Sequence, residues 1–133
     1  MEGLAVTPGN CAAKRNTDDK TVFDGPVKQY YRGNRYAFSG EMTNHFQTVT
    51  SPNTVNCVAG DDSTSAALLL IQSASSFHSG GVNACFADGS VTFISETIDV
   101  GDQSRSTGVT IGESPFGVWG ALGSINGGES KSL

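Results

Sequence analysis

The sequence between residues 75 and 94 reads Ser75-Ser76-Phe77-His78-Ser79-Gly80-Gly81-Val82-Asn83-Ala84-Cys85-Phe86-Ala87-Asp88-Gly89-Ser90-Val91-Thr92-Phe93-Ile94. Two alternating segments lie on either side of an Asp-Gly dipeptide. Such a dipeptide is a strong hairpin signal, because a type I′ turn needs two positive φ angles, which Asp tolerates and Gly adopts freely. We therefore predict an antiparallel hairpin with strands over 82–87 and 90–95 and a type I′ turn at Asp88-Gly89.

The alternation of apolar residues predicts which side chains share a face. Val82, Ala84 and Phe86 lie on one face of the first strand, and Val91 and Phe93 share a face of the second. We also interpret Cys85 as a small buried hydrophobic residue. The apolar run 66–71 is predicted as a further strand that leads into the hairpin as a meander. A helix that begins at the polar residues 61–65 is the alternative.

The spacing within this segment is typical of a known family. His78, nine intervening residues and then Asp88-Gly89 resemble the prepilin-type, processing-associated H-X9-DG proteins of the DUF1559 family, which are common in planctomycetes. The resemblance extends to Arg32-Gly33 with Tyr36, to the loop Pro52–Cys57 and to residues 117–123. It covers most of residues 30–129, while residues 1–29 match weakly.

The resemblance implies a fold, a compartment and a kind of partner. It implies one pilin-like head domain over residues 1–133, of α+β class and mostly β, with an antiparallel meander or hairpin sheet and one short C-terminal helix. Such a protein would be a non-enzymatic structural subunit outside the cytoplasm, packed against other pilin-like subunits or cell-surface proteins. The alternative is a secreted or surface β-rich binding module for glycan or protein.

The N-terminus departs from the family pattern. It lacks the Phe-Thr-Leu-Ile-Glu type of start, and it lacks the basic and apolar segments of a secretory signal. We expect either the C-terminal part of a longer, helix-anchored protein or a variant without the assembly helix, and we favour the first. The longest apolar run, 66–71, is shorter than the roughly 20 residues of a membrane-spanning helix. We therefore expect no membrane span in this chain.

Composition excludes some functions and favours others. The chain has 133 residues, 17 of them glycine, with 16% charged residues and a net charge of -5. A chain without a basic stripe cannot neutralise the phosphates of nucleic acid, so we do not expect nucleic acid as a partner. The many turn-forming residues indicate a β-rich fold in one domain.

No catalytic constellation is visible, so we expect no enzyme activity. Ten extended residues span about 33 Å, which places His78 and Asp88 at opposite ends of a strand. We interpret His78 as structural, with its imidazole bonded to backbone groups around Gly80-Gly81, and keep a ligand or titrating role as the alternative. No Gly-x-Ser-x-Gly elbow is present.

The three cysteines, Cys11, Cys57 and Cys85, do not have the spacing of a zinc site. In an exported protein, a disulfide between Cys11 and Cys57 is the plausible pairing, because both lie in turn-like contexts, and three free thiols are the alternative. The odd count leaves Cys85 as a thiol.

The C-terminal part contains a helix signal. Ser114 as N-cap, Pro115 at the first position and Gly123 after the end predict a helix over 116–122. Trp119 is predicted to lie in the core. Residues 99–113 are interpreted as an inserted surface loop, and 127–133 as a tail.

Aromatic and acidic residues suggest two possible binding sites. Tyr30, Tyr31, Tyr36, Phe38 and Phe46 are interpreted as core rings, with a stacking platform for sugars as the alternative. Asp99 and Asp102 are weak candidates for calcium ligands. The resemblance to calcium-stabilised pseudopilins slightly strengthens this expectation. A solvated acidic loop is the alternative. We therefore expect no cofactor, with calcium as the exception to test.

Overall fold

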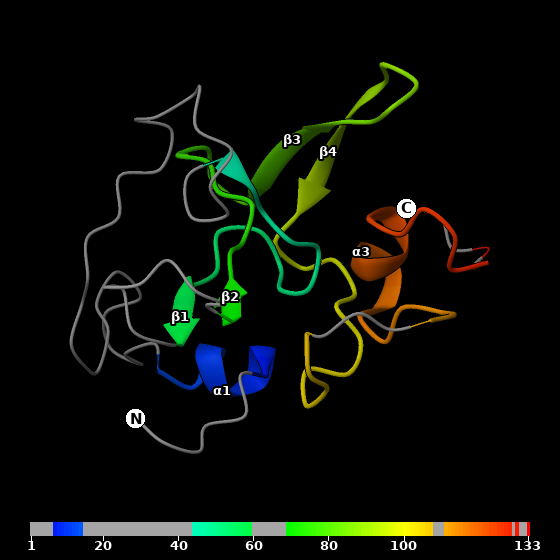
Figure 1. Ribbon diagram of the computed structural model, residues 1–133. Helices are drawn as coiled ribbons and strands as arrows, with labels where there is room; N and C mark the ends of the chain where they lie inside the picture. Colours follow the sequence, from blue (N-terminus) through cyan, green and yellow to red (C-terminus); the bar gives the residue numbers. More distant parts are fainter. Residues whose placement is uncertain (1–6, 15–43, 60–68, 108–110, 129, 131–132) are drawn as a thin grey trace.

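The computed structural model describes residues 7–14, 44–59, 69–107, 111–128, 130 and 133. Two short helices, α1 (Pro8–Ala12) and α3 (Gly117–Leu122), flank four strands. The strands are β1 (Cys57–Ala59), β2 (Leu69–Ile71), β3 (Gly81–Cys85) and β4 (Val91–Ser95). Figure 1 shows α1 beside β1 and β2, while the β3–β4 hairpin extends away from them and α3 lies near β4.

The strands form two separate antiparallel pairs. Cys57 of β1 pairs with Ile71 of β2, and Gly81 of β3 pairs with Ser95 of β4. The predicted antiparallel hairpin is confirmed, and so is strand structure over the described part of 66–71. The predicted meander is wrong, because β2 pairs with β1 and not with β3. After β2, Ser73 and Ala74 are buried and bond to the segment before β1, so β2 does not continue into a pairing with β3.

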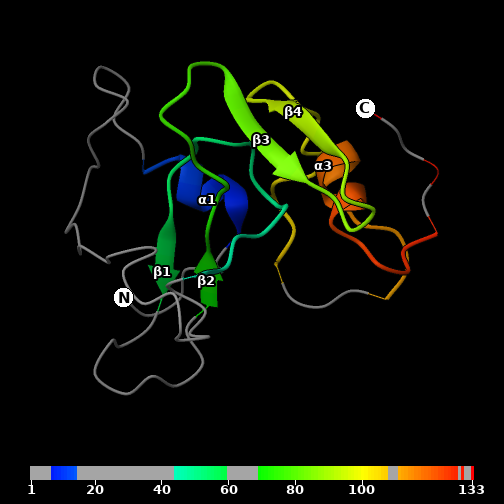
Figure 2. The ribbon, with the colours of Figure 1, turned by 90° about the horizontal axis from the view of Figure 1, so that it is seen from above.

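Each strand pair has its own group of buried residues. The first contains Cys11, Val55 and Ile71, and the second contains Ala74, Val82, Ile94 and Trp119. The segment 71–74 contributes Ile71 to one group and Ala74 to the other, so it runs from one part of the core to the next. Figure 2, seen from above, shows the hairpin lying over α3 on the side away from β1 and β2.

The helix α3 begins at Gly117, one residue later than predicted, and ends at Leu122 before Gly123. Trp119 is only 2% exposed, and its ring stacks against that of Phe46 with the centroids 6.3 Å apart. None of the described helices has the length and apolar character to span a membrane. The predicted ring residues Tyr30 to Phe38, the residues 61–68 and the segment 15–29 lie outside the described residues.

Candidate functional site

The end of the hairpin differs from the predicted turn. Phe86 N–H donates to Ser90 O at 2.9 Å and Gly89 N–H donates to Phe86 O at 2.9 Å, which leaves three residues in the loop. Gly89 has φ 83°, whereas Asp88 is not in the positive-φ region. The predicted type I′ turn is therefore wrong. A three-residue loop that ends in a left-handed glycine is the next most common hairpin connection, and it needs only one positive φ.

The Asp88 carboxylate stabilises this loop through its own chain. Its Oδ1 accepts a hydrogen bond from Ser90 N–H at 2.8 Å. Hydrogen bonds from the Ser90 hydroxyl and the Ser90 N–H lower the pKa of Asp88, because both donors favour the charged carboxylate. Since the folded-state pKa lies below the unfolded value, this contribution to stability is present above the unfolded pKa and is lost as the pH falls through the folded one.

The two glycines at the start of the hairpin, Gly80 before β3 and Gly81 as its first residue, are required for different reasons. Gly80 has φ 85°, which a residue with a Cβ adopts only with strain. Gly81 lies so close to the neighbouring strand that a Cβ would overlap Ile94 O and the ring of Phe93. The Phe93 ring thus occupies the space next to Gly81 that a side chain at this position would fill. Gly80 therefore meets a backbone requirement, and Gly81 allows the two strands to approach closely at the start of the hairpin.

His78 and the turn are far apart along the hairpin, as predicted. His78 is exposed just before β3, and Asp88 is exposed in the loop beyond its other end. The expected bonds from the imidazole to the glycine turn are not found among the described residues; instead, the His78 backbone N–H donates to Ser76 Oγ at 3.1 Å. The hairpin therefore brings these two residues of the motif into no common site.

The prediction for Cys85 is wrong. Cys85 is a free and exposed thiol, with its Sγ 3.5 Å from Phe86 O. The reason is the pleat: Val82, Ala84 and Phe86 pack on the core group, so Cys85 must point the other way. Val91 and Phe93 share its outer face, while Ile94 of the same strand is fully buried.

Asn53 joins the loop Pro52–Cys57 to the hairpin, a role that was not predicted from the sequence. Its backbone N–H donates to Ala74 O at 2.8 Å, and its Oδ1 accepts from Ser76 N–H at 2.7 Å. Its Nδ2 donates to Glu96 Oε1 at 2.7 Å and lies 3.5 Å from Gly81 O. One amide side chain thus contacts the residues before β3, the start of β3 and the residue after β4.

The backbone of Asn53 is adapted to this position. Its φ is 58°, and it is the only residue other than glycine with a positive φ in the described part of the chain. Asparagine enters this region more readily than other residues with a Cβ. The preceding Pro52 is fully buried. The Pro-Asn pair is the signal that could have identified this junction, since it is a frequent turn initiator.

The same loop is tied to segment 72–74 by polar contacts. Ser73 Oγ donates to Thr54 O at 2.7 Å, and Ser73 N–H donates to Asn56 Oδ1 at 2.8 Å. Gln47 N–H donates to Gln72 O at 2.8 Å. Because buried backbone groups need such partners, these contacts let the segment between β2 and β3 run through the interior without a strand neighbour.

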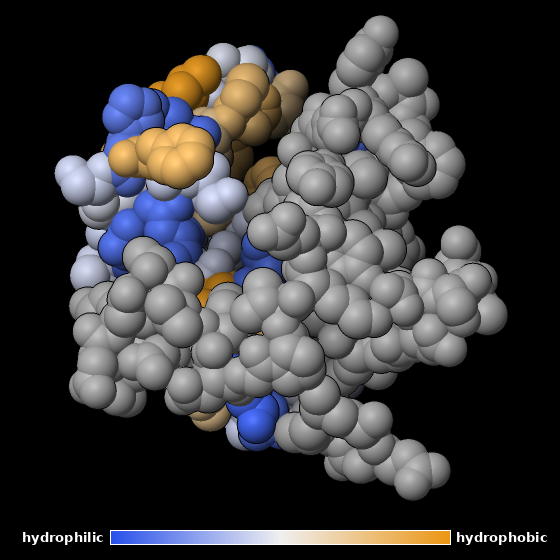
Figure 3. Space-filling model, turned by 90° about the vertical axis from the view of Figure 1, so that its left-hand side faces the viewer, coloured by the Kyte–Doolittle hydropathy of each residue, from blue (hydrophilic) through white to orange (hydrophobic). Residues whose placement is uncertain are grey.

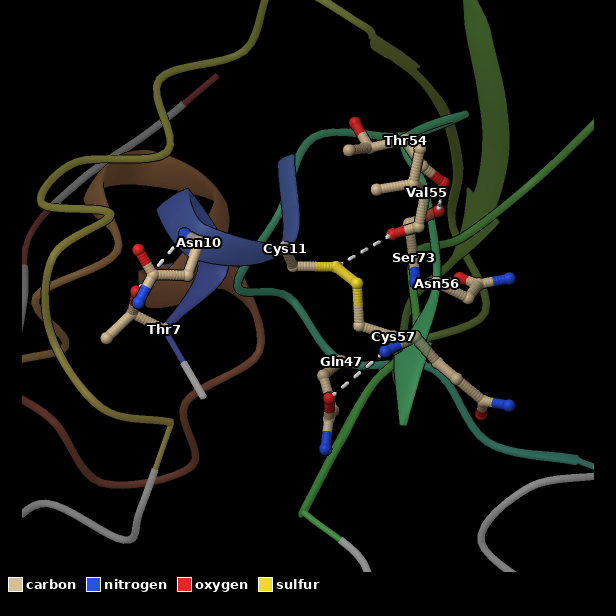
Figure 4. The surroundings of a disulfide bond; sticks show 10 residues. Thr7, Asn10, Cys11, Gln47, Thr54, Val55, Asn56, Cys57 and Ser73 are labelled. Carbon is tan, nitrogen blue, oxygen red and sulfur yellow. Dashed lines mark hydrogen bonds between the residues drawn. A yellow bond between two sulfur atoms is a disulfide. The ribbon is translucent and has the colours of Figure 1, made fainter. Parts of the chain in front are cut away.

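A disulfide between Cys11 and Cys57 holds α1 to β1, which confirms the predicted pairing (Figure 4). The helix supplies Cys11, which is buried against Val55 and Ile71, and its Sγ lies 3.7 Å from Val55 O. Thr7 caps the helix by accepting from Asn10 N–H at 3.2 Å, and Pro8 occupies its first turn. The disulfide therefore links the first group of buried residues covalently across α1 and β1, two elements that are distant in sequence.

Asp99 is a helix cap in this structure. Its Oδ2 accepts from Val118 N–H at 3.2 Å, its Oδ1 accepts from Gly101 N–H at 2.9 Å, and its backbone carbonyl accepts from Trp119 N–H at 3.0 Å. The Val118 and Trp119 N–H groups belong to the first turn of α3 and have no partner within the helix, whereas Gly101 lies in the loop before it. The predicted N-cap, Ser114, instead accepts from Phe116 N–H at 3.3 Å.

Asp102, the other calcium candidate, is engaged locally. Its Oδ1 accepts from the Ser104 N–H at 3.0 Å and from the Ser104 hydroxyl at 2.6 Å. These hydrogen bonds, the hydroxyl first, lower the pKa of Asp102, and Arg105 lowers it further. Among the described residues, no group of three His, Cys, Asp or Glu side chains is arranged to hold a metal ion.

The segment after Asp99 connects other parts of the fold, although it was interpreted as an insertion. Gln103 is half-buried, and its Nε2 donates to Val49 O at 2.9 Å and to Val100 O at 2.6 Å. Its carbonyl accepts from Gly9 N–H at 2.8 Å, and Asp102 N–H donates to Pro115 O at 2.9 Å. Through these bonds the loop links α1, the residues before β1 and the start of α3.

These features define a class of protein: a small disulfide-containing domain in which an Asn-centred junction fixes an antiparallel hairpin. The family described as "Protein of unknown function (DUF1559)" matches residues 5–101, and the chain belongs to that family. The match begins earlier than the motifs suggested and ends before α3. No curated protein and no solved structure matches the chain.

Proposed function

We propose that this chain is the head domain of a pilin-like or pseudopilin-like structural subunit that works outside the cytoplasm without catalysis. Its partners would be further subunits of the same kind. The observation that carries the proposal is the outer face of the β3–β4 hairpin, which consists of Asn83, Cys85, Val91 and Phe93 together with Gly81 and Ser95.

This outer face is apolar where it is most exposed. Val91 is 66% exposed and Phe93 is 52% exposed. In the register, Cys85 lies opposite Val91, and Asn83 lies opposite Phe93, so the exposed apolar groups are neighbours. A contiguous exposed apolar surface commonly marks a contact with another protein.

The outer face is also free of charged side chains, although the whole chain has a net charge of -5. Two copies that meet through this face would therefore bury no unpaired charge, whose desolvation would be costly. On the described surface visible in Figure 3, hydrophobic and hydrophilic residues lie side by side. A neutral face on an acidic molecule supports contact between like subunits.

Two further observations support the location and the absence of catalysis. The Cys11–Cys57 disulfide is the kind of bond that persists in oxidising compartments. The titratable residues of the H-X9-DG motif, His78 and Asp88, lie at opposite ends of the hairpin and are both exposed. Their separation supports a structural role for the motif. Unfolding measured with and without calcium would test whether the domain binds this cation.

The experiment is a substitution on the outer face. Val91→Lys introduces a charge beside Cys85, and Ile125→Lys, at a fully exposed apolar residue after α3, is the matched control. Sedimentation velocity over a concentration series, combined with a bifunctional thiol crosslinker at Cys85, reports self-association. We expect crosslinked oligomers from the wild type and from Ile125→Lys, and monomers from Val91→Lys with an unchanged circular dichroism spectrum.

Two results would contradict the proposal. One is a wild-type chain that stays monomeric and uncrosslinked at every concentration, which would favour the binding-module alternative. The other is equal self-association of Val91→Lys and wild type, which would place the contact on another surface.

A further inference from the structure

The chain beyond α3 contains an Asn-Gly pair with little support from its surroundings. The N–H groups of Gly123 and Ser124 donate back to α3, at 3.2 Å and 3.1 Å. In the described part of the chain, no hydrogen bond is formed by the Asn126 side chain or by the Gly127 N–H. Ile125 and Asn126 are exposed, and Gly128 has φ 78°.

These are the conditions for a spontaneous reaction between neighbouring residues. The backbone nitrogen of Gly127 can attack the side-chain carbonyl carbon of Asn126. The new C–N bond closes a cyclic imide, the bond to the side-chain nitrogen breaks, and ammonia leaves. Glycine has no Cβ, so its nitrogen reaches the carbonyl carbon over a wide range of φ and ψ.

We propose that Asn126 is a deamidation site, at which water then opens the imide. Addition of water at one carbonyl carbon of the ring gives aspartate, and addition at the other gives isoaspartate, with the proton going to the nitrogen. The reaction needs only water and no oxidant or cofactor. It changes the net charge of the chain from -5 to -6, by one unit, since a neutral amide is replaced by a carboxylate.

The sequence and the structure distinguish Asn126-Gly127 from Asn53 and from the Asp88-Gly89 pair. Asn126-Gly127 is the single Asn-Gly pair of the sequence. Asn53 is held through both side-chain atoms, which accept from Ser76 N–H and donate to Glu96. Asp88-Gly89 could form the same cyclic imide, but its reacting groups are hydrogen-bonded. Gly89 N–H, whose nitrogen would attack, donates to Phe86 O, and the Asp88 carboxylate accepts from Ser90 N–H.

The test is peptide mapping by mass spectrometry after incubation of the folded chain in mildly alkaline buffer. We expect the peptide that contains Asn126 to show the mass gain of amide replaced by acid, together with an isoaspartate isomer. An additional, more acidic species should form at the same rate in ion-exchange chromatography. Deamidation should be confined to Asn126 in the folded protein.

Two variants and one comparison decide the result. Gly127→Ala should slow the reaction several-fold, and Asn126→Gln should remove the acidic species; both positions lie outside the helices and strands, so the fold should persist. In urea, the Asn126 rate should hardly change, whereas isomerisation at Asp88 should speed up as its hydrogen bonds are lost. Equal rates in wild type and Gly127→Ala, or a folded chain that deamidates first at another asparagine, would overturn the proposal.

Discussion

At the scale of single residues, Asn53 links three parts of the fold through one backbone N–H and one side-chain amide. Its amide replaces the strand neighbour that the segment between β2 and β3 lacks, and it also reaches the ends of the hairpin. Side-chain amides can act in this way because they donate and accept at once. We infer that Asn53 fixes the angle between the disulfide-containing part and the hairpin.

Substitution of Asn53 separates its two contributions. Asn53→Ala removes the side-chain hydrogen bonds and keeps a Cβ at positive φ, so we expect a loss of about 2 to 4 kcal/mol in the free energy of unfolding. Asn53→Gly loses the same bonds but has no Cβ to strain the backbone. We therefore expect it to be more stable than Asn53→Ala by about 1 kcal/mol. Urea denaturation followed by circular dichroism measures both.

The matched control for this prediction is Asn83→Ala, since Asn83 is exposed on the outer face of β3. We expect its unfolding midpoint to lie close to that of the wild type. An Asn53→Ala variant as stable as Asn83→Ala would show that the junction does not need the amide.

Residue-level roles were predictable only where the sequence fixes local geometry. The pairing of Cys11 with Cys57 and the core position of Trp119 followed from their neighbours in sequence. The outward direction of Cys85 follows from its odd-numbered separation from the buried Val82 along the strand, whereas the apolar character of cysteine by itself predicts burial. Glu96 and Gln103 had no local signal for their linking roles, because Asn53 and Val49, the residues to which they bond, lie more than forty residues away in the chain.

At the scale of elements, α3 depends on a residue outside it. A helix of six residues is too short to be stable alone, because nucleation costs more than a few hydrogen bonds return. Burial of Trp119 and the cap from Asp99 supply the difference. Gly117, at φ 62°, permits the close approach, since a Cβ there would meet the Asp99 carboxylate.

The Asp99 cap gives a prediction for the element. Asp99→Ala leaves the Val118 N–H of α3 without a side-chain acceptor, and we expect a loss of about 1 kcal/mol. Asp102→Ala is the control, because the Asp102 carboxylate bonds only to Ser104 in its own loop and the substitution keeps the backbone. Thermal unfolding, followed by the fluorescence of the single Trp119, should show a lower midpoint for the first variant alone.

A larger effect of Asp102→Ala would contradict this assignment. Repeating both melts with calcium and with a chelator adds a separate readout. If the two carboxylates served a cation, calcium would raise the wild-type midpoint and neither variant would respond.

The sequence predicted the hairpin and the helix but not the pairing of β2 with β1. Hairpins depend on local turn residues, whereas the β1–β2 pair joins segments whose register is set by burial of Ile71 against Cys11 and Val55. The turn type was also missed, since Asp-Gly suits both a two-residue loop and the last two positions of a three-residue loop.

At the scale of the whole molecule, two small groups of buried residues have to act together. Neither strand pair is large enough to be stable by itself, because an isolated two-stranded hairpin is marginal in water. Asn53, Gln103 and the segment 71–74 connect the two groups. The disulfide adds a covalent constraint across 46 positions of sequence.

Removal of this bond should destabilise the entire domain. In the chain-entropy model, closing a loop of this length contributes about 4 kcal/mol. We expect the double variant Cys11→Ser and Cys57→Ser to unfold at a much lower urea concentration than the wild type, while Cys85→Ser unfolds as the wild type does. Reduction of the wild type should reproduce the double variant, and an unchanged midpoint after reduction would contradict the prediction.

The disulfide also has a consequence for how the chain responds to proteases. Any single cut in the backbone between Cys11 and Cys57 leaves the two pieces joined through sulfur. The cut protein would keep its mass in a non-reducing gel and would separate into two fragments only after reduction. A domain built in this way can lose the continuity of its backbone and still remain one covalent molecule.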